Sequence, residues 1–136
     1  MDWHNGEYVL TDEKNRMDLD AVCRLLRDTY WAADRSREVN ERAFAHSVSF
    51  SLFHHGRQVG FARAVTDEAT FTYLCDVLVA PEHRRRGLGR WMISTMLAHP
   101  RLQTLTHALR TQDAHGLYTR FGFAPAEYLR KSSRPL

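Results

Sequence analysis

The stretch VLVAPEHRRRGLGRW, residues 77–91, decides the fold, because it joins an apolar strand to a helix through a turn rich in arginine and glycine. A helix that begins near Leu88 has free backbone N–H groups and the positive end of its dipole in the first turn. Glycine lets a bulky group approach that backbone, and arginine adds forked donors for oxyanions. The stretch therefore predicts a cradle for a pyrophosphate at a strand-to-helix turn.

The glycine spacing distinguishes this turn from two other phosphate-binding motifs. It is not the G-x-x-x-x-G-K-[ST] of a Walker loop, and the third glycine of the dinucleotide fingerprint is missing. The turn does fit R-x-x-G-x-G, directly after a strand and V-x-P-E-x-R. This pattern resembles the acetyl-CoA-binding motif of the GNAT superfamily of N-acetyltransferases. Three arginines alone would also suit a solvated charge run or a nucleic-acid patch, but the glycines and the following helix favour the cofactor turn.

A second segment carries the same resemblance. TQDAHGLYTRFGF, residues 111–123, is similar to the C-terminal segment of the family, N-x-x-A-x-x-[FL]-Y-x-x-x-G-F. Thr111 stands where the family often has asparagine, and its hydroxyl would offer the cofactor contact instead. The matching positions are Ala114, Leu117, Tyr118, Gly122 and Phe123.

The resemblance implies a reaction in which an amine attacks acetyl-CoA directly, within a ternary complex. The pantetheine arm would pair like an added strand with the backbone of Val77, Leu78 and Val79, in a slot opened where two parallel strands splay apart. A backbone N–H near Val77 or Leu78 would polarise the thioester carbonyl. The diphosphate would lie on the backbone N–H groups of Arg84, Arg85, Arg86, Gly87, Leu88, Gly89 and Arg90.

Two residues are candidates for the proton transfers. Tyr118 aligns with the tyrosine that commonly protonates the departing thiolate in this family, and the alternative is that its ring packs in the core. Asp76 lies inside the apolar run YLCDVLV, where a buried charge needs a reason. It would accept a proton from the substrate ammonium or bind that ammonium, or else it would pair with an arginine such as Arg63. The sequence leaves both alternatives open.

Aromatic residues suggest where the amine acceptor would bind, and the histidines raise the possibility of a metal site. Tyr30 and Trp31, at the end of the first predicted helix, could form an apolar or cation–π wall for an amine, with core packing as the alternative for Tyr30. His54 and His55 are adjacent on a predicted hairpin and would point apart. Because no metal-ligand spacing accompanies the histidines, we expect no metal site.

Composition limits the class of protein. A chain of 136 residues suits one domain, residues 1–136, and a net charge of +3 favours anionic ligands without demanding nucleic acid. Cys23 and Cys75 are isolated, which favours reduced thiols in a cytoplasmic protein. We expect neither a secretory signal nor a membrane span.

The hydrophobic periodicity predicts a mixed α/β (α+β) domain, with helices flanking one central, mostly antiparallel sheet. Residues 71–109 should form a right-handed crossover between parallel strands. Helices are expected after the N-cap residues Asp18 (through Tyr30) and Ser36, from Leu88 until Pro100, and over residues 113–120. Strands are expected at residues 7–11, 50–53, 59–65, 71–80, 102–109 and 123–129.

Together these observations predict a GNAT-fold N-acetyltransferase that acts on a primary amine. The compact chain favours a small-molecule acceptor, and a homodimer is compatible with the family. Two alternatives from other classes are a non-catalytic acyl-CoA-binding regulatory module and a nucleic-acid-binding protein. The second is disfavoured because no aromatic residues are interleaved with the arginines.

Overall fold

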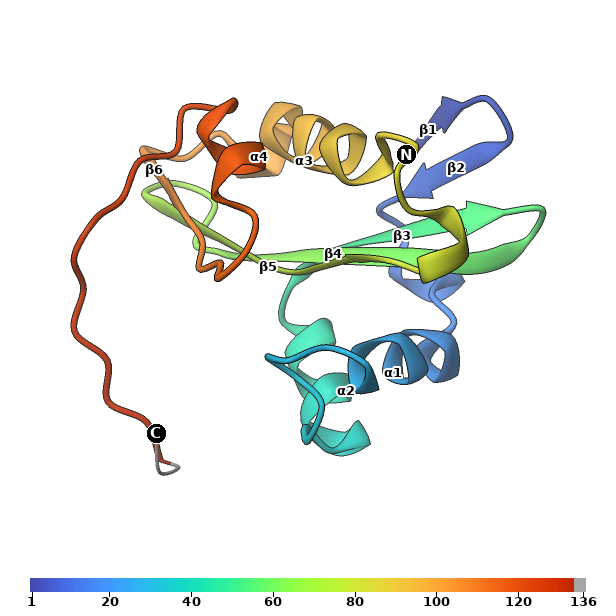
Figure 1. The fold of residues 1–136 in the computed structure, drawn as a ribbon, viewed down its shortest axis with the longest axis horizontal. Coiled ribbons are helices and arrows are strands. Elements are labelled where there is room, and N and C mark those ends of the chain that lie inside the picture. Colours follow the sequence, from blue (N-terminus) through green and yellow to red (C-terminus); the bar gives the residue numbers. More distant parts are fainter. Residues whose placement is uncertain (134–136) are drawn as a thin grey trace.

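A six-stranded sheet forms the middle layer of the computed structural model, which describes residues 1–133 (Figure 1). The strands lie side by side in sequence order, antiparallel from β1 to β5, whereas β5 and β6 are parallel. This arrangement confirms the mixed sheet and the parallel crossover expected from the sequence. The strands are β1 (Asp2–Asn5), β2 (Tyr8–Thr11), β3 (Val48–His54), β4 (Arg57–Thr66), β5 (Phe71–Val79) and β6 (Thr106–Ala108).

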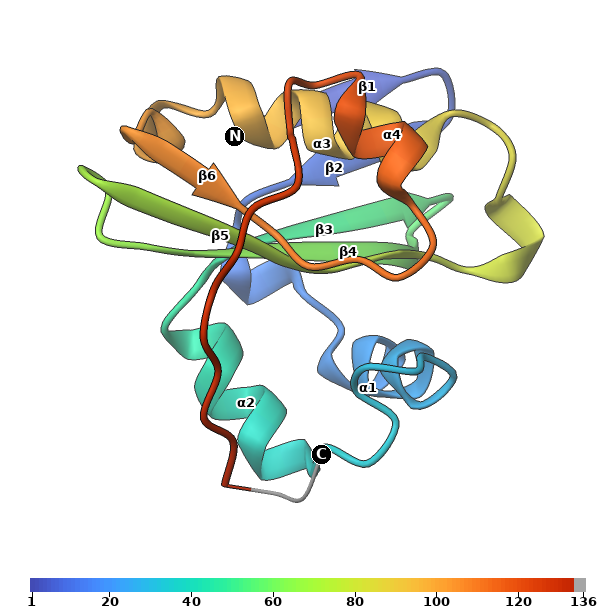
Figure 2. The same ribbon diagram turned by 60° about the vertical axis from the view of Figure 1, so that its left-hand side comes forward.

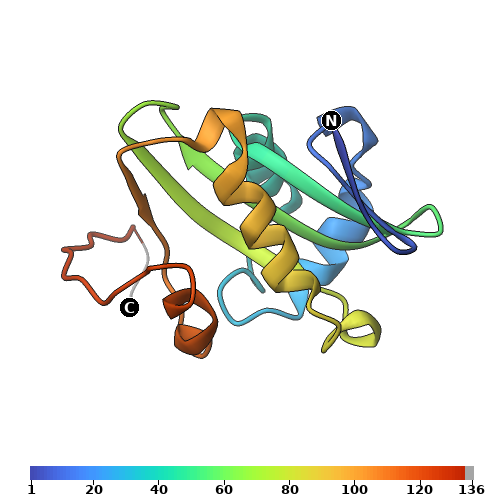
Figure 3. The ribbon, with the colours of Figure 1, turned by 90° about the horizontal axis from the view of Figure 1, so that it is seen from above.

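Helices cover both faces of the sheet. On one face lie α1 (Leu19–Arg27) and α2 (Arg37–Ala45), and on the other lie α3 (Leu88–Ala98) and α4 (His115–Thr119) (Figure 1 and Figure 2). Seen from above, α3 crosses the sheet while α4 sits beside it on the β6 side (Figure 3). Three short 3₁₀ turns, η1 (Lys14–Arg16), η2 (Pro81–His83) and η3 (Pro100–Leu102), complete the described elements. No helix within residues 1–133 is long and apolar enough to cross a bilayer.

The predicted helix starts are confirmed by their capping bonds. The backbone N–H of Ala21 donates to the carboxylate of Asp18 over 3.1 Å, and the side chain of Ser36 caps α2 in the same way. The end of α1 differs from the prediction, because the helix stops at Arg27 rather than Tyr30. The hydroxyl of Thr29 donates to the carbonyl of Leu26 over 2.7 Å, which satisfies a terminal acceptor and turns the chain away.

The β-strand boundaries at the chain ends depart further from the sequence prediction. An additional strand, β1, pairs with β2 across a turn at Gly6, whose φ is 59°. The strand expected at residues 102–109 is shortened to β6, since residues 100–102 form η3. The last strand, expected at residues 123–129, is wrong: residues 124–133 have no regular secondary structure. Its neighbour β6 is only three residues long, and Pro125 lacks an N–H for a ladder.

Two hydrophobic clusters fill the space on either side of the sheet. The larger packs the α3 face and includes Leu74 and Met92. The smaller packs under α1 and α2 and includes Leu26, Phe61 and Leu78. Leu74 and Leu78 are four residues apart on β5, so a regular strand would direct both to one face. They face opposite clusters because an irregularity intervenes, and it lies beside the candidate site.

Candidate functional site

The candidate site is the opening between β5 and β6. Their parallel pairing spans three residue pairs and ends at Tyr73 and Ala108. Beyond it lies a cavity of about 410 Å³, lined by residues 73–77 of β5, residues 110–114 of the loop after β6, and the side chains of Tyr30, Trp31, Tyr118 and Arg130. The expected splay of two parallel strands is therefore present. It leaves the outer backbone edge of β5 without a partner strand after Tyr73, within the described residues.

A β-bulge in β5 shapes one wall of this cavity. The register to β4 shifts between the pairs Phe61–Leu78 and Arg63–Cys75, so one extra residue of β5 is accommodated there. Asp76 takes the strain, with a φ of 53°. The extra residue exchanges the two faces of the strand, which explains why Leu74 and Leu78 join different clusters.

The bulge presents the carboxylate of Asp76 to two arginines and a tryptophan. Arg63 Nε donates to Oδ2 over 2.6 Å, and Arg35 donates to both oxygens, over 3.1 Å and 2.5 Å. Trp31 Nε1 donates to Oδ1 over 2.9 Å. Burial acts to raise the pKa of Asp76, but the bonds and charges of the two arginines outweigh it and hold that pKa below its usual value.

These contacts bear on the two roles left open for Asp76. A carboxylate with a lowered pKa, whose oxygens already accept four hydrogen bonds, is a poor acceptor for a substrate proton. The geometry favours the ion-pair alternative, with Arg63 as the sequence suggested. Arg35 was not foreseen. Nothing in the polar run around it, ADRSRE, indicates a partner 41 residues away.

Tyr118 lines the cavity from α4. Its ring packs edge-on against Phe123 at a centroid separation of 5.9 Å, so the ring is also part of the hydrophobic packing, as the alternative interpretation from the sequence expected. Burial, followed by the nearby Tyr30 and Asp113, raises the pKa of Tyr118 to about 12. The phenol therefore carries its proton at neutral pH and can donate it.

Tyr30 and Trp31 form an aromatic wall of the same cavity. They lie in the turn after α1, not on the helix, and their rings meet edge-to-face at 5.0 Å. The backbone N–H of Gln112 donates to the hydroxyl of Tyr30 over 3.1 Å, which ties this turn to the loop across the cavity. Both rings are about half exposed, as an open wall requires, at 52% for Tyr30 and 43% for Trp31.

Thr111 organises the loop that precedes α4. Its hydroxyl oxygen accepts from the backbone N–H of Ala114 over 3.0 Å and of Asp113 over 3.3 Å. These bonds form a local turn of the type that serine and threonine favour. The hydroxyl proton is still available for a ligand at the cavity, which Thr111 lines.

The arginine–glycine turn has the backbone of an anion site. Gly87 precedes α3 with a φ of 77°, and Arg85 also has a positive φ of 65°. No side chain caps the helix. A Cβ added at Gly87 or Gly89 would meet nothing within 4 Å, so the space over the first turn is open. Free N–H groups, the helix dipole and open space together fit a bound diphosphate.

The side chains of this turn divide into two groups. Arg84 folds back, and its Nε donates to the carbonyl of Val79 over 2.9 Å, which ties the turn to the end of β5. Leu88 is buried in the larger cluster and anchors the start of α3. The guanidinium groups of Arg85, Arg86 and Arg90 belong to exposed residues and can reach a ligand.

His54 and His55 lie together with Glu7 in an arrangement that could hold a metal ion, which the spacing of the histidines in the sequence does not predict. Glu7, in the turn between β1 and β2, places Oε2 3.3 Å from Nε2 of both His54 and His55. Among the described residues, this trio is the one group of His, Cys, Asp or Glu close enough to share an ion. Sequence spacing missed it because Glu7 is 47 residues from His54 and meets it through the β2–β3 pairing. The trio is distant in sequence from every residue that lines the cavity.

The chain is similar to several known proteins. Residues 19–123 match the model of the acetyltransferase (GNAT) family. A Gibberella zeae protein whose name assigns it to the acetyltransferases is 29% identical over 114 residues, which cover 69% of this chain and 64% of that protein. The chain thus spans less than two thirds of the length of this curated relative.

Solved structures show the same fold. The crystal structure of a Xanthomonas campestris protein assigned to the GNAT family is 40% identical, covers 97% of this chain and 96% of that one, and superposes with a TM-score of 0.89. N-acetylglutamate synthase from Neisseria gonorrhoeae, solved with coenzyme A and N-acetyl-glutamate, gives a TM-score of 0.76 at 19% identity. It covers 91% of this chain and 30% of that one, and the likeness is one of fold alone.

Proposed function

Because the chain belongs to the GNAT family of acetyltransferases, and so uses acyl-CoA as donor, we propose that residues 1–136 form one domain that transfers an acetyl group from acetyl-CoA to a primary amine. The amine attacks directly in a ternary complex. The observation that carries this proposal is the cavity at the splay of β5 and β6, which joins an unpaired strand edge to a wall of aromatic residues.

The donor end of the site follows from the backbone. The N–H groups of the turn at residues 84–90 receive the diphosphate, because two glycines leave that surface open. Arg85, Arg86 and Arg90 add charge around it. The free edge of β5 at Val77, Leu78 and Val79 holds the pantetheine arm as a strand would be held, and Thr111 donates its hydroxyl.

Acetyl-CoA supplies the activated thioester. A backbone N–H at Val77 or Leu78, beside the bulge, polarises its carbonyl oxygen. Tyr118 gives its proton to the departing sulfur as the C–S bond breaks, and the proton that the attacking nitrogen loses restores the phenol through water. The pKa of about 12 supports this role because the phenol stays protonated throughout the physiological range. Cys75 lines the same cavity, but burial raises the pKa of its thiol to about 11, which favours direct attack by the amine over transfer through a cysteine.

The acceptor end is the aromatic wall of Tyr30 and Trp31. An ammonium or amine can lie against these faces, and a small molecule suits a cavity of about 410 Å³. Asp76 acts here as a positioning residue: it holds Trp31 through the indole N–H and neutralises Arg35 and Arg63. The unpaired cysteines suit the reducing cytoplasm, where we expect the reaction to take place.

Two measurements test the proposal in sequence. Coenzyme A should raise the melting temperature of the protein, and a panel of small amines with acetyl-CoA should then release free thiol for at least one class of amine. Stabilisation by coenzyme A without thiol release for any amine would indicate a non-catalytic acyl-CoA-binding module. If coenzyme A does not raise the melting temperature, the proposed binding site for the acetyl donor is also contradicted.

A further inference from the structure

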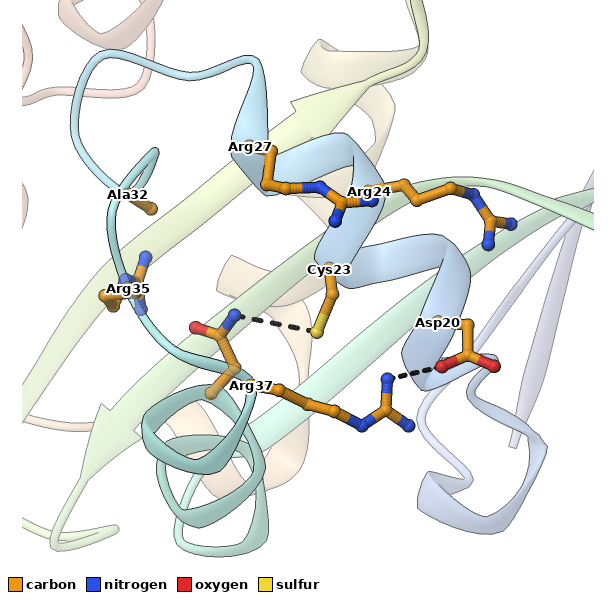
Figure 4. A pocket seen from close by; sticks show the side chains of 8 residues that line it. Asp20, Cys23, Arg24, Arg27, Ala32, Arg35 and Arg37 are labelled. Carbon is orange, nitrogen blue, oxygen red and sulfur yellow. Dashed lines mark hydrogen bonds and ion pairs between the residues drawn. The ribbon is translucent and has the colours of Figure 1, made fainter.

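A second cavity of about 260 Å³ lies between α1 and α2, and it shares no lining residue with the cavity at β5 and β6 (Figure 4). Four arginines line it, against one carboxylate, Asp20. Figure 4 shows two of them extending from α1, one in the loop that follows, and one reaching from α2 to Asp20. We call this cavity the arginine pocket, after Arg24, Arg27, Arg35 and Arg37.

The charges in the arginine pocket are only partly neutralised. Arg37 pairs with Asp20, and Arg35 pairs with Asp76 behind the pocket. Arg24 and Arg27 make no hydrogen bond or ion pair within the described part of the chain. They are three residues apart on one face of α1, an arrangement in which like charges repel. The pocket therefore concentrates positive charge that residues 1–133 do not fully balance.

A buried polar group in the same pocket also lacks a partner. Asn40 is 3% exposed, and its Nδ2 donates to Sγ of Cys23 over 3.6 Å. Its Oδ1 has no hydrogen-bond partner, which is costly for a buried amide. Turned over, the amide would accept from the Cys23 thiol and direct its N–H₂ group toward a ligand anion. The unpartnered amide is independent of the arginines, and in this second orientation it suits the same class of ligand.

We propose that the arginine pocket binds a small oxyanion carrying two or more negative charges, in the form of phosphate or carboxylate groups, as an effector separate from the transferase substrates. Guanidinium groups bind both kinds of group through two parallel hydrogen bonds. The volume of about 260 Å³ limits the ligand to a small molecule. The turn at residues 29–35 separates this ligand from the acyl-transfer cavity.

Arg35 connects the arginine pocket to the transferase site. It donates one hydrogen bond from each terminal nitrogen to Asp76 and also lines the pocket. A guanidinium has five N–H donors, so three remain beyond those two bonds. An anion there fixes Arg35 without breaking its pair with Asp76. Because Asp76 also accepts from Trp31, binding stabilises the turn that carries the acceptor wall.

Isothermal titration with inorganic phosphate and with citrate, at constant ionic strength and with saturating coenzyme A, tests the proposal. We expect saturable binding at one site, weakened at least tenfold in Arg24→Ala/Arg27→Ala. The matched control is Arg42→Ala, an exposed arginine on α2 that does not line the pocket, and it should bind as the unaltered protein does. The melting temperature of each variant with coenzyme A verifies folding, and it tests the donor site separately.

Three results would overturn the proposal. The first is the absence of saturable binding, or an equal loss in Arg42→Ala. The second is binding of phosphate only when coenzyme A is left out of the titration, because phosphate would then occupy the turn at residues 84–90. The third is strictly competitive inhibition of acetyl transfer against the amine, which would make the pocket part of the acceptor site. The connection through Arg35 further predicts that phosphate changes tryptophan emission, and that Trp31→Phe removes this change.

Discussion

Arg63 on β4 donates from Nε to Oδ2 of Asp76 on β5 over 2.6 Å, at the bulge where the two strands lose their regular register. The terminal nitrogen Nη1 of Arg63 donates to the hydroxyl of Ser47 over 3.0 Å. The side chain of Arg63 is 13% exposed and that of Asp76 is 2% exposed, so this ion pair is largely removed from water. The same carboxylate accepts from Arg35 and Trp31, which supports the positioning role proposed for Asp76.

Removal of the carboxylate should therefore destabilise the protein. Asp76→Ala leaves two partly buried arginines without their counter-charge, and we expect a loss of about 3 kcal/mol in the free energy of unfolding. Urea unfolding at pH 7 measures it, with Asp28→Ala as the control for an exposed aspartate. A loss below about 0.5 kcal/mol, the ordinary size of a surface change, would show that the pairs contribute little.

The same group predicts how stability depends on pH. The folded pKa of Asp76 is lowered relative to its unfolded value of about 3.9, so the folded state binds fewer protons in this range. Its contribution is fully present above the unfolded pKa and is lost as the pH falls through the folded pKa. The free energy of unfolding should decline below about pH 4, and more steeply in the unaltered protein than in Asp76→Asn. Equal slopes from pH 2 to pH 7 would contradict this assignment.

The diphosphate turn gives a prediction that separates binding from folding. Gly89 lies in the first turn of α3, and a Cβ added there would meet nothing within 4 Å. Gly89→Val should therefore fold, yet lose the rise in melting temperature caused by coenzyme A, because the side chain occupies the diphosphate position. Gly87→Val is less informative, since a φ of 77° adds backbone strain of about 1–2 kcal/mol.

Ser94→Val is the matched control for the glycine variant. It places the same side chain on an exposed position of α3, away from the first turn. Coenzyme A should stabilise it as it does the unaltered protein. Full stabilisation of Gly89→Val as well would show that the diphosphate lies elsewhere.

The sequence predicted the strand, turn and helix of residues 71–98 because their signals are local. Pro81 ends the strand, Gly87 permits a positive φ, and apolar spacing continues from Leu88. The same local signals located Asp18 and Ser36 as helix caps. Where an element depends on a distant partner, the prediction failed: residues 123–129 could form a strand, but β6 is too short to pair with them.

The features of the candidate site also fall into those that local sequence predicts and those that depend on the folded structure. The backbone turn and the position of Tyr118 follow from motifs, whereas the partners of Asp76 follow from a bulge. One extra residue at Asp76 redirects its carboxylate to Arg35 and Arg63, and apolar alternation in YLCDVLV does not encode that shift. The arginine pocket is also invisible in sequence, since Arg24 and Arg37 belong to different helices that only the packed fold brings together.

Tyr118 gives the most direct test of the chemistry. With a pKa of about 12 it stays protonated, and it lines the cavity beside the free edge of β5. Tyr118→Phe keeps the ring packed against Phe123 but removes the proton, so kcat for thiol release should fall about 100-fold. Stabilisation by coenzyme A should be unchanged. Because the phenol does not ionise below pH 10, the rate should show no decline due to Tyr118 between pH 7 and pH 10.

The control for this change is Tyr128→Phe, which alters an exposed tyrosine that does not line the cavity. Its kcat should equal that of the unaltered protein. A Tyr118→Phe rate within twofold of the original would remove the phenol as proton donor, since loss of a general acid costs far more than that. Water in the cavity would then have to protonate the sulfur, and the backbone N–H proposed at Val77 or Leu78 would be the contribution of the chain to the chemical step.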